Sequence, residues 1–271
     1  MKRVVGIPIV VCVITLLVVP SYGQRPDWSA LEQSIKQLED PDWKGRSVAF
    51  HQLLGAGSVY VDPRRALSEV LRKWPEKSDQ IKLALIRLLE RENALEKERE
   101  KVILEKYAKE GSDFPHPFTD AEERMEYYAN LIAAVTSLRD TRSLEALIGA
   151  LRTGYMVTST LAGFGSAALD RMIELLNRGD TLTRGLASFV LAHMLDAENV
   201  SRVSDPLSRQ KIKDALRRAV GDSSPYVRLA SVEGLAKLGD PDVIPLIQNL
   251  ATSDPLKQVR DAATEALKKP R

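Results

Sequence analysis

Apolar positions recur with a helical period along most of the chain, most clearly over residues 222–269. Counting from Arg228, small residues fall at positions +3 and +6, and leucines fall at +7 and +10. This spacing puts them on one face of a helix, where small side chains let a neighbouring helix approach closely. Asp240 and Pro241 then begin a second helix, because Asp accepts the first N–H groups and Pro lacks the N–H that would stay unpaired. The segment therefore predicts a helix, a Gly-Asp turn and a second helix.

The same pair of helices returns along the sequence. Val227 and Arg228 recur 32 residues later as Val259 and Arg260, and a further copy starts at Arg184. A helix pair that repeats about every 30 residues is typical of a solenoid, in which each unit buries its apolar face against its neighbours. About six such pairs can be counted. The sequence predicts an all-α fold, a right-handed α-solenoid of stacked antiparallel helix pairs.

The clearest copy starts at Val227 and reads V-R-x-x-S-V-x-G-L-A-x-L-G-D, followed by x-x-V-I-P-L-I-x-x-L. This pattern resembles the HEAT repeat, and more closely its short bacterial form in phycobilin-lyase-like proteins. The resemblance covers roughly residues 40–269 and is strongest over residues 126–269. It implies that recurrent charged residues form a structural ladder of hydrogen bonds between successive repeats. The residues concerned are Arg184, Arg228, Arg260, Asp140, Asp196 and Asp240.

The first 23 residues have a different character. Lys2 and Arg3 precede an apolar run of sixteen residues, and small residues stand at positions −3 and −1 of a possible cleavage site after Gly23. This arrangement predicts a secretory signal peptide, and hence a bacterial protein that is periplasmic or secreted. The run is short for a membrane span, so we expect none after cleavage. An uncleaved N-terminal anchor is the alternative.

Three regions follow from these patterns: a signal peptide over residues 1–23, degenerate helical repeats over 24–125, and HEAT-like repeats with a C-terminal cap over 126–271. The middle region includes a densely charged helical stretch, RENALEKEREK, and a loop over residues 111–119. The signal peptide holds two of the 39 basic residues and none of the 37 acidic ones, so the mature chain carries no net charge. Because nucleic-acid binders usually carry a basic surplus, we expect no nucleic-acid partner.

The sequence offers little that could carry out chemistry. None of the three histidines (His51, His116 and His193) is followed by glutamate, so the paired His-Glu motifs of HEAT-like di-iron hydroxylases are missing. The oxygen ligands between Asp196 and Asp205 lack the order of a calcium loop. No nucleophile motif, phosphate-binding glycine loop or zinc pattern is present. We expect no metal site and no cofactor, and the sequence favours a non-enzyme without settling the point.

Five residues are the predicted partner contacts. The loop GSDFPHPFT places two aromatic rings outside any helical period, and these either bind a partner or pack back onto the solenoid. A second pair lies beside a short segment rich in β-branched and small residues. The predicted function is a non-enzymatic protein–protein interaction scaffold that binds a protein partner on its concave or loop surface. The alternative, which rests on the resemblance alone, is a lyase-like protein that handles a chromophore or other small molecule. The predicted contacts are Phe114, His116, Phe118, Tyr155 and Met156.

Overall fold

The computed structural model describes residues 27–55, 62–110 and 122–268. Within these residues the chain consists of α-helices joined by short turns and 3₁₀ segments, with no strand. The prediction of an all-α solenoid is confirmed. None of the helices in the described ranges is both long and apolar enough to cross a membrane.

The N-terminal part of the array contains the longest helix, α4, which begins directly after a 3₁₀ turn. Its helices are α1 (Trp28–Gln37), α2 (Trp43–Leu53), α3 (Pro63–Lys73), η1 (Pro75–Lys77), α4 (Ser78–Glu110) and α5 (Glu122–Ser137).

The rest of the array has shorter helices. They are η2 (Thr141–Ser143), α6 (Leu144–Gly149), η3 (Leu151–Thr153), α7 (Tyr155–Gly163), α8 (Ser166–Arg178), α9 (Thr181–His193), η4 (Val200–Val203), α10 (Pro206–Ala219), α11 (Pro225–Leu238), η5 (Pro241–Val243), α12 (Ile244–Ser253) and α13 (Lys257–Lys268).

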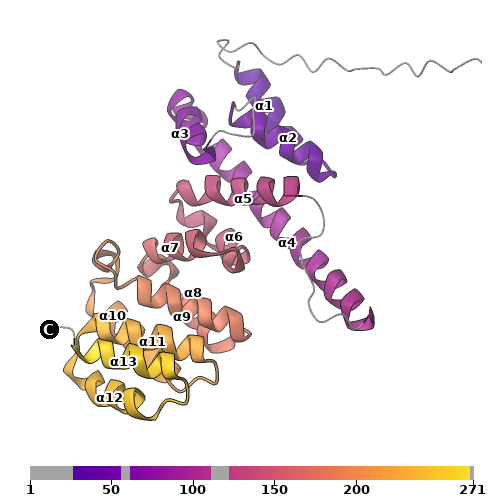
Figure 1. The fold of residues 1–271 in the computed structure, drawn as a ribbon. Coiled ribbons are helices and arrows are strands. Elements are labelled where there is room, and N and C mark those ends of the chain that lie inside the picture. Colours follow the sequence, from indigo (N-terminus) through magenta and orange to yellow (C-terminus); the bar gives the residue numbers. More distant parts are fainter. Residues whose placement is uncertain (1–26, 56–61, 111–121, 269–271) are drawn as a thin grey trace, which may run out of the picture.

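The helices form two layers. In one layer α2, α5, α7, α9, α11 and α13 pack on one another in chain order. The other layer holds the intervening helices, where α4 packs on α6 and α8 packs on α10. Figure 1 shows the array running from α1 and α2 at one end to α12 and α13 at the other. We call the layer that contains α9 and α11 the first layer, because its helices open each repeat.

The small-residue face predicted from Arg228 lies in the core between these helices. Ser231 and Leu235 have no exposed surface. A β-carbon placed on Gly234 would lie 3.2 Å from the α-carbon of Ala192 in α9, so the two first-layer helices approach too closely for a side chain there. Close packing of this kind stabilises a solenoid, whose repeats contact only their neighbours.

The Gly-Asp turn after α11 differs from its prediction in two respects. Gly239 ends α11 with a φ of +69°, a left-handed conformation that glycine adopts without steric cost. Pro241 opens the next segment as predicted, but as a 3₁₀ turn that runs into α12. The Asp240 side chain caps no backbone N–H, because it forms an ion pair with Lys213 of α10 at 3.0 Å.

A buried polar cluster joins α2, α4 and α5 in the N-terminal part. Arg46 and Glu92 are each 1% exposed and form an ion pair at 2.5 Å. The Tyr127 hydroxyl donates to the same Glu92 carboxylate at 3.1 Å, and burial raises the pKa of this phenol. Since a buried charge is tolerated only with a partner, this cluster fixes how α4 sits against α2 and α5.

Candidate functional site

An arginine ladder connects the repeats of the C-terminal half. The Arg184 guanidinium donates from Nε and Nη2 to the two carboxylate oxygens of Asp222 at 2.8 and 2.9 Å. One repeat further, Arg228 binds both oxygens of Asp254 in the same way, at 2.7 and 2.9 Å. Paired bonds between a guanidinium and a carboxylate are among the strongest in proteins. Each pair joins one first-layer helix to the turn that precedes the next.

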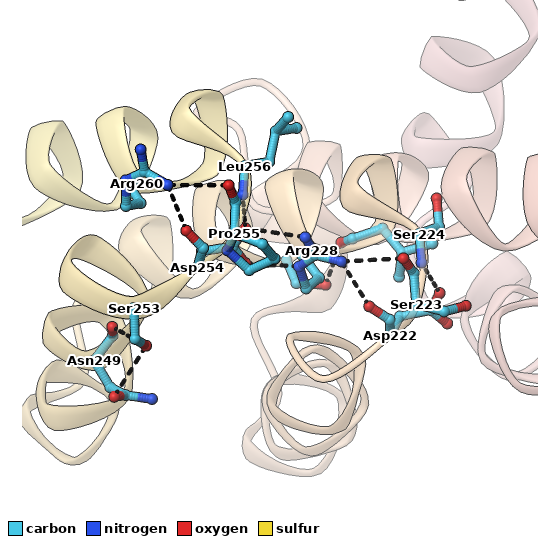
Figure 2. A network of polar contacts seen from close by, with 12 residues as sticks. Asp222, Ser223, Ser224, Arg228, Asn249, Ser253, Asp254, Pro255, Leu256 and Arg260 are labelled. Atoms are coloured by element: carbon cyan, nitrogen blue, oxygen red, sulfur yellow. Dashed lines mark hydrogen bonds and ion pairs between the residues drawn. The ribbon is translucent and has the colours of Figure 1, made fainter.

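Each of these arginines also binds the turn that leads into its own helix. Arg228 donates from Nη1 to the carbonyl oxygens of Asp222 and Ser223 at 2.9 and 3.1 Å, as Figure 2 shows. Arg260 repeats this contact with the carbonyl oxygen of Asp254 at 2.6 Å. Arg46 does so with the carbonyl oxygen of Asp40 at 2.8 Å. The same local geometry therefore recurs from α2 to α13.

The carboxylates of the ladder differ from those that the resemblance implied. Asp140 caps η2 and forms an ion pair with Arg142, and Asp196 lies near His193. Asp240 pairs with Lys213, as described above. The structure brings none of these three aspartates to Arg184, Arg228 or Arg260. The partners are instead Asp222 and Asp254.

A sequence signal for the actual partners exists. Asp222 lies six residues before Arg228, and Asp254 lies six residues before Arg260. Asp40 stands at the same distance from Arg46. The Asp six positions before Arg228 and the one before Arg260 therefore mark the turns on which Arg184 and Arg228 dock.

The ladder changes the ionisation of its carboxylates. The Arg228 guanidinium holds the pKa of the Asp254 carboxyl below its usual range, and Arg184 does the same for Asp222. Asp254 is 4% exposed. Hydrogen bonds to the charged form outweigh the burial that opposes it, so both aspartates stay ionised at neutral pH.

By linking helix starts, the ladder sets three first-layer helices side by side. Arg152, just before α7, binds the Asp180 carboxylate before α9 at 2.5 Å. The Arg184 pair then joins α9 to the turn before α11. Because α7 packs on α9 and α9 packs on α11, the exposed faces of these three helices adjoin one another.

This surface carries a cluster of large apolar side chains, which we call the aromatic patch. Tyr155 is 65% exposed, Leu182 is 53% exposed and Tyr226 is 75% exposed. Leu182, Leu186, Phe189 and His193 follow the helical spacing of one face of α9. The patch consists of Tyr155 and Met156 from α7, Leu182, Leu186, Phe189 and His193 from α9, and Tyr226 from α11.

Contacts between rings hold the patch together. The His193 ring lies edge-on to Phe189, with centroids 4.2 Å apart, and edge-on to Tyr155 at 5.8 Å. On the other side of α9, Tyr226 lies over Gly185. A β-carbon added to Gly185 would lie 3.6 Å from the β-carbon of Tyr226. Three consecutive repeats therefore contribute to one aromatic surface.

Paired polar groups border the patch at the C-terminal end of α9. The His193 Nδ1 atom lies within hydrogen-bond distance of the Asp196 carboxylate, which also pairs with Lys237 of α11 at 2.5 Å. Asn199 donates to the carbonyl oxygen of His193 at 3.1 Å. Burial raises the pKa of Asp196, but the hydrogen bonds from Lys237 and His193 outweigh it, so the net pKa is lowered. A polar border around an apolar centre is the usual composition of a protein-binding surface.

A cavity of about 280 Å³ opens close to the other end of α9. It lies where the C-terminal ends of α8 and α10 meet the N-terminal end of α9. Its polar lining combines the first ladder pair, Arg184 and Asp222, with the side chains of Asn177 and Arg218.

The predicted contacts divide into two groups. Tyr155 and Met156 lie in the aromatic patch, whereas Phe114, His116 and Phe118 lie outside the described residues. The sequence pattern did not single out Leu182, Phe189 or Tyr226, because apolar residues with helical spacing resemble core positions. The signal for Leu182 and Phe189 is that α9 carries apolar residues around most of its circumference, which leaves some of them exposed once the core is filled.

No group of three or more His, Cys, Asp and Glu side chains that could hold a metal ion occurs in the part of the chain that the structure describes. His193 is bonded to Asp196 through Nδ1 and packed between aromatic rings. The geometry of this region can bind apolar groups and pair charges.

A match to a family model supports the repeat architecture of the C-terminal half. Residues 169–268 match the family model for HEAT repeats, and no curated protein matches the chain. A designed armadillo repeat protein in complex with the peptide (KR)4 has a TM-score of 0.44 and 15% identity, covering 88% of this chain and 98% of that one. A computationally designed armadillo repeat protein for modular peptide recognition has a TM-score of 0.42 and 15% identity, with the same coverage. Residues 169–268, which run from within α8 to the end of α13, are thus similar to HEAT repeats.

Proposed function

We propose that the protein is a non-enzymatic protein–protein interaction scaffold whose partner docks on the aromatic patch. The observation that supports this function is the exposure of Tyr155, Leu182 and Tyr226 on three helices that the ladder holds side by side. Large apolar side chains gathered on a protein surface usually mark an interaction site.

The composition of the patch suits a protein partner. Tyr, Phe and Met are enriched in the buried centres of protein interfaces, where they provide much contact area. Tyr226 and Leu182 carry much exposed surface, whereas Phe189 and His193 form a half-buried base. A partner side chain that covers this base would remove apolar surface from water on both molecules, which drives association.

Binding measured with matched variants tests this function. The tagged full chain is incubated with a cell-envelope extract, crosslinked, and any captured protein is purified for titration. Changing Tyr155, Leu182 and Tyr226 together to serine should weaken saturable binding at least about tenfold, because the apolar contacts are lost. The control is Leu207→Ser on α10, a side chain that is 67% exposed but lies in the other layer. Equal affinities of the triple variant and the control would refute the site.

The same preparation separates the scaffold from the alternative. A lyase-like protein that handles a chromophore predicts bilin absorbance in the purified chain after incubation with bilin. The scaffold function predicts no absorbance change, and a stoichiometric change would favour the alternative.

We further propose that the scaffold acts outside the cytoplasm. The support is the N-terminal sequence, in which Lys2 and Arg3 precede the apolar run and small residues precede the cleavage position after Gly23. N-terminal sequencing of the protein from the periplasmic fraction should start at Gln24. Recovery of the intact chain in the cytoplasm would contradict export, and recovery in the membrane would indicate an anchor.

A further inference from the structure

We propose that the segment docked on the aromatic patch carries an aspartate or glutamate whose carboxylate enters the cavity beside Arg218. This inference rests on the proposed function and adds the chemistry of the partner. Two arginines, Arg184 and Arg218, line the cavity, and they differ in how their side chains are paired.

Arg184 is fully engaged. Its guanidinium binds both oxygens of Asp222 and donates from Nη1 to the carbonyl oxygen of Gly179 at 3.2 Å. This pair therefore supplies no net charge to a ligand, and it fixes one wall of the cavity.

Arg218 differs from the other arginines nearby. It is exposed at the C-terminal end of α10 and lines the cavity, yet within the described ranges its side chain has no ion pair or hydrogen bond. Its neighbour Arg217 binds the Asp242 carboxylate at 2.8 Å. Arg218 is therefore a cation without a counter-ion at the mouth of a cavity that could hold one.

A carboxylate matches the groups that line this cavity. The planar guanidinium of Arg218 matches the two oxygens of a carboxylate, and the Asn177 amide can donate a further hydrogen bond. Leu176, Ala215 and Ala219 provide apolar lining for the methylene groups of an acidic side chain.

The cavity and the patch are close enough for one short segment to reach both. Arg184 of the cavity and Gly185, over which Tyr226 lies, are consecutive, and Asp222 lies four residues before Tyr226 in the turn that leads into α11. Consecutive α-carbons are about 3.8 Å apart. Residues two apart in an extended chain lie about 7 Å apart. The partner motif is accordingly an acidic residue two to four positions from a large apolar one.

Selection from a displayed library of random peptides tests this specificity. Peptides are selected on the full chain, and the most enriched peptide is labelled and titrated by fluorescence polarisation. The expected peptides have Asp or Glu two to four positions from Leu, Ile, Phe, Tyr or Trp. Arg218→Glu should weaken the labelled peptide about tenfold or more, as should replacing its acidic residue by the amide. The control Arg217→Glu should change affinity less than about twofold.

The other outcomes distinguish this inference from the proposed function. Apolar peptides without an acidic preference that lose binding when Tyr226 and Leu182 are changed to serine would overturn the carboxylate site and leave the scaffold function standing. Peptides indifferent to those two changes, or a library from which no peptide is enriched, would overturn both. A dimer in sedimentation experiments that dissociates in Tyr226→Ser would make the occupant a second copy of this chain, which also overturns the inference.

Discussion

Replacing Asp254 by asparagine should expose the energetic role of the ladder. The substitution keeps the shape of the side chain but removes the charge that Arg228 binds. Arg228 is 8% exposed and Asp254 is 4% exposed, so solvent cannot replace the lost partner. The change therefore leaves a buried guanidinium opposite an amide that can point an N–H at it.

The expected loss of stability depends on which hydrogen bonds Arg228 keeps. Breaking a buried ion pair by removing one partner costs about 3–5 kcal/mol. Arg228 keeps its hydrogen bonds from Nη1 to the carbonyl oxygens of Asp222 and Ser223. We therefore expect the lower end, a loss of about 3 kcal/mol in the free energy of unfolding. For a protein of this size, that corresponds to a fall in Tm of roughly 6–12 °C.

The assay is urea denaturation of the Asp254→Asn variant and of a control variant, Asp261→Asn. In the control pair, Asp261 lies 2.6 Å from Lys257, but the two side chains are 58% and 77% exposed. Exposed pairs contribute less than about 0.5 kcal/mol, so the control should be nearly neutral. Hydrogen exchange should accelerate first in α11, α12 and α13, because repeats depend on their neighbours. Equal stabilities of the two variants would refute the ladder as a stabilising device.

Further predictions concern packing and pH. Gly234→Ala should lower the free energy of unfolding by about 1–3 kcal/mol, because its β-carbon would lie 2.5 Å from Cδ1 of Leu216. Gly185→Ala should raise it by about 0.5–1 kcal/mol, because the nearest atom is the Tyr226 β-carbon at 3.6 Å and alanine favours the helix. Urea titration of the two variants checks both signs. Because the pKa of Asp254 is lowered on folding, its contribution is present above about pH 4 and lost as pH falls through the folded pKa. Acid unfolding followed by circular dichroism should show a smaller loss of stability below about pH 4 in Asp254→Asn than in the unmodified chain.

The helical repeat was predictable because its determinants are local. Small and apolar residues at fixed steps from Arg228 define one face, and Ser231 and Leu235 lie fully buried on it. Gly239 ends α11 as the Gly-Asp turn predicted. These features depend on residues within one repeat, where the sequence spacing determines which face of the helix a residue occupies.

The partners within the ladder were not predictable in the same way. Asp240 and Asp222 both precede helices, so composition alone treats them alike. Which of them meets an arginine depends on how one repeat is set against the next. Asp222 precedes the first-layer helix α11 and faces Arg184, whereas Asp240 precedes the second-layer segment and faces Lys213. This distinction depends on how successive repeats stack, which the sequence spacing within one repeat does not determine.

The aromatic patch was predicted only where a sequence irregularity marked it. Tyr155 and Met156 lie in the segment over residues 154–163, which is short and rich in β-branched and small residues. Leu182 and Phe189 carry no such mark, because their helical spacing is also that of buried residues. Their exposure is set by the packing of α9 against α7, α8 and α11, which the local pattern does not fix.

Site-specific photocrosslinking tests the central claim most directly. Benzoylphenylalanine is introduced at Leu182 in the aromatic patch or at Leu207 in the other layer, and each protein is irradiated with the envelope extract. The two positions are similarly exposed, at 53% and 67%. A scaffold that binds through the patch should give a discrete adduct from position 182, suppressed when Tyr155 and Tyr226 are changed to serine, and none from position 207. Adducts of equal yield from both positions, or from position 207 alone, would contradict the account.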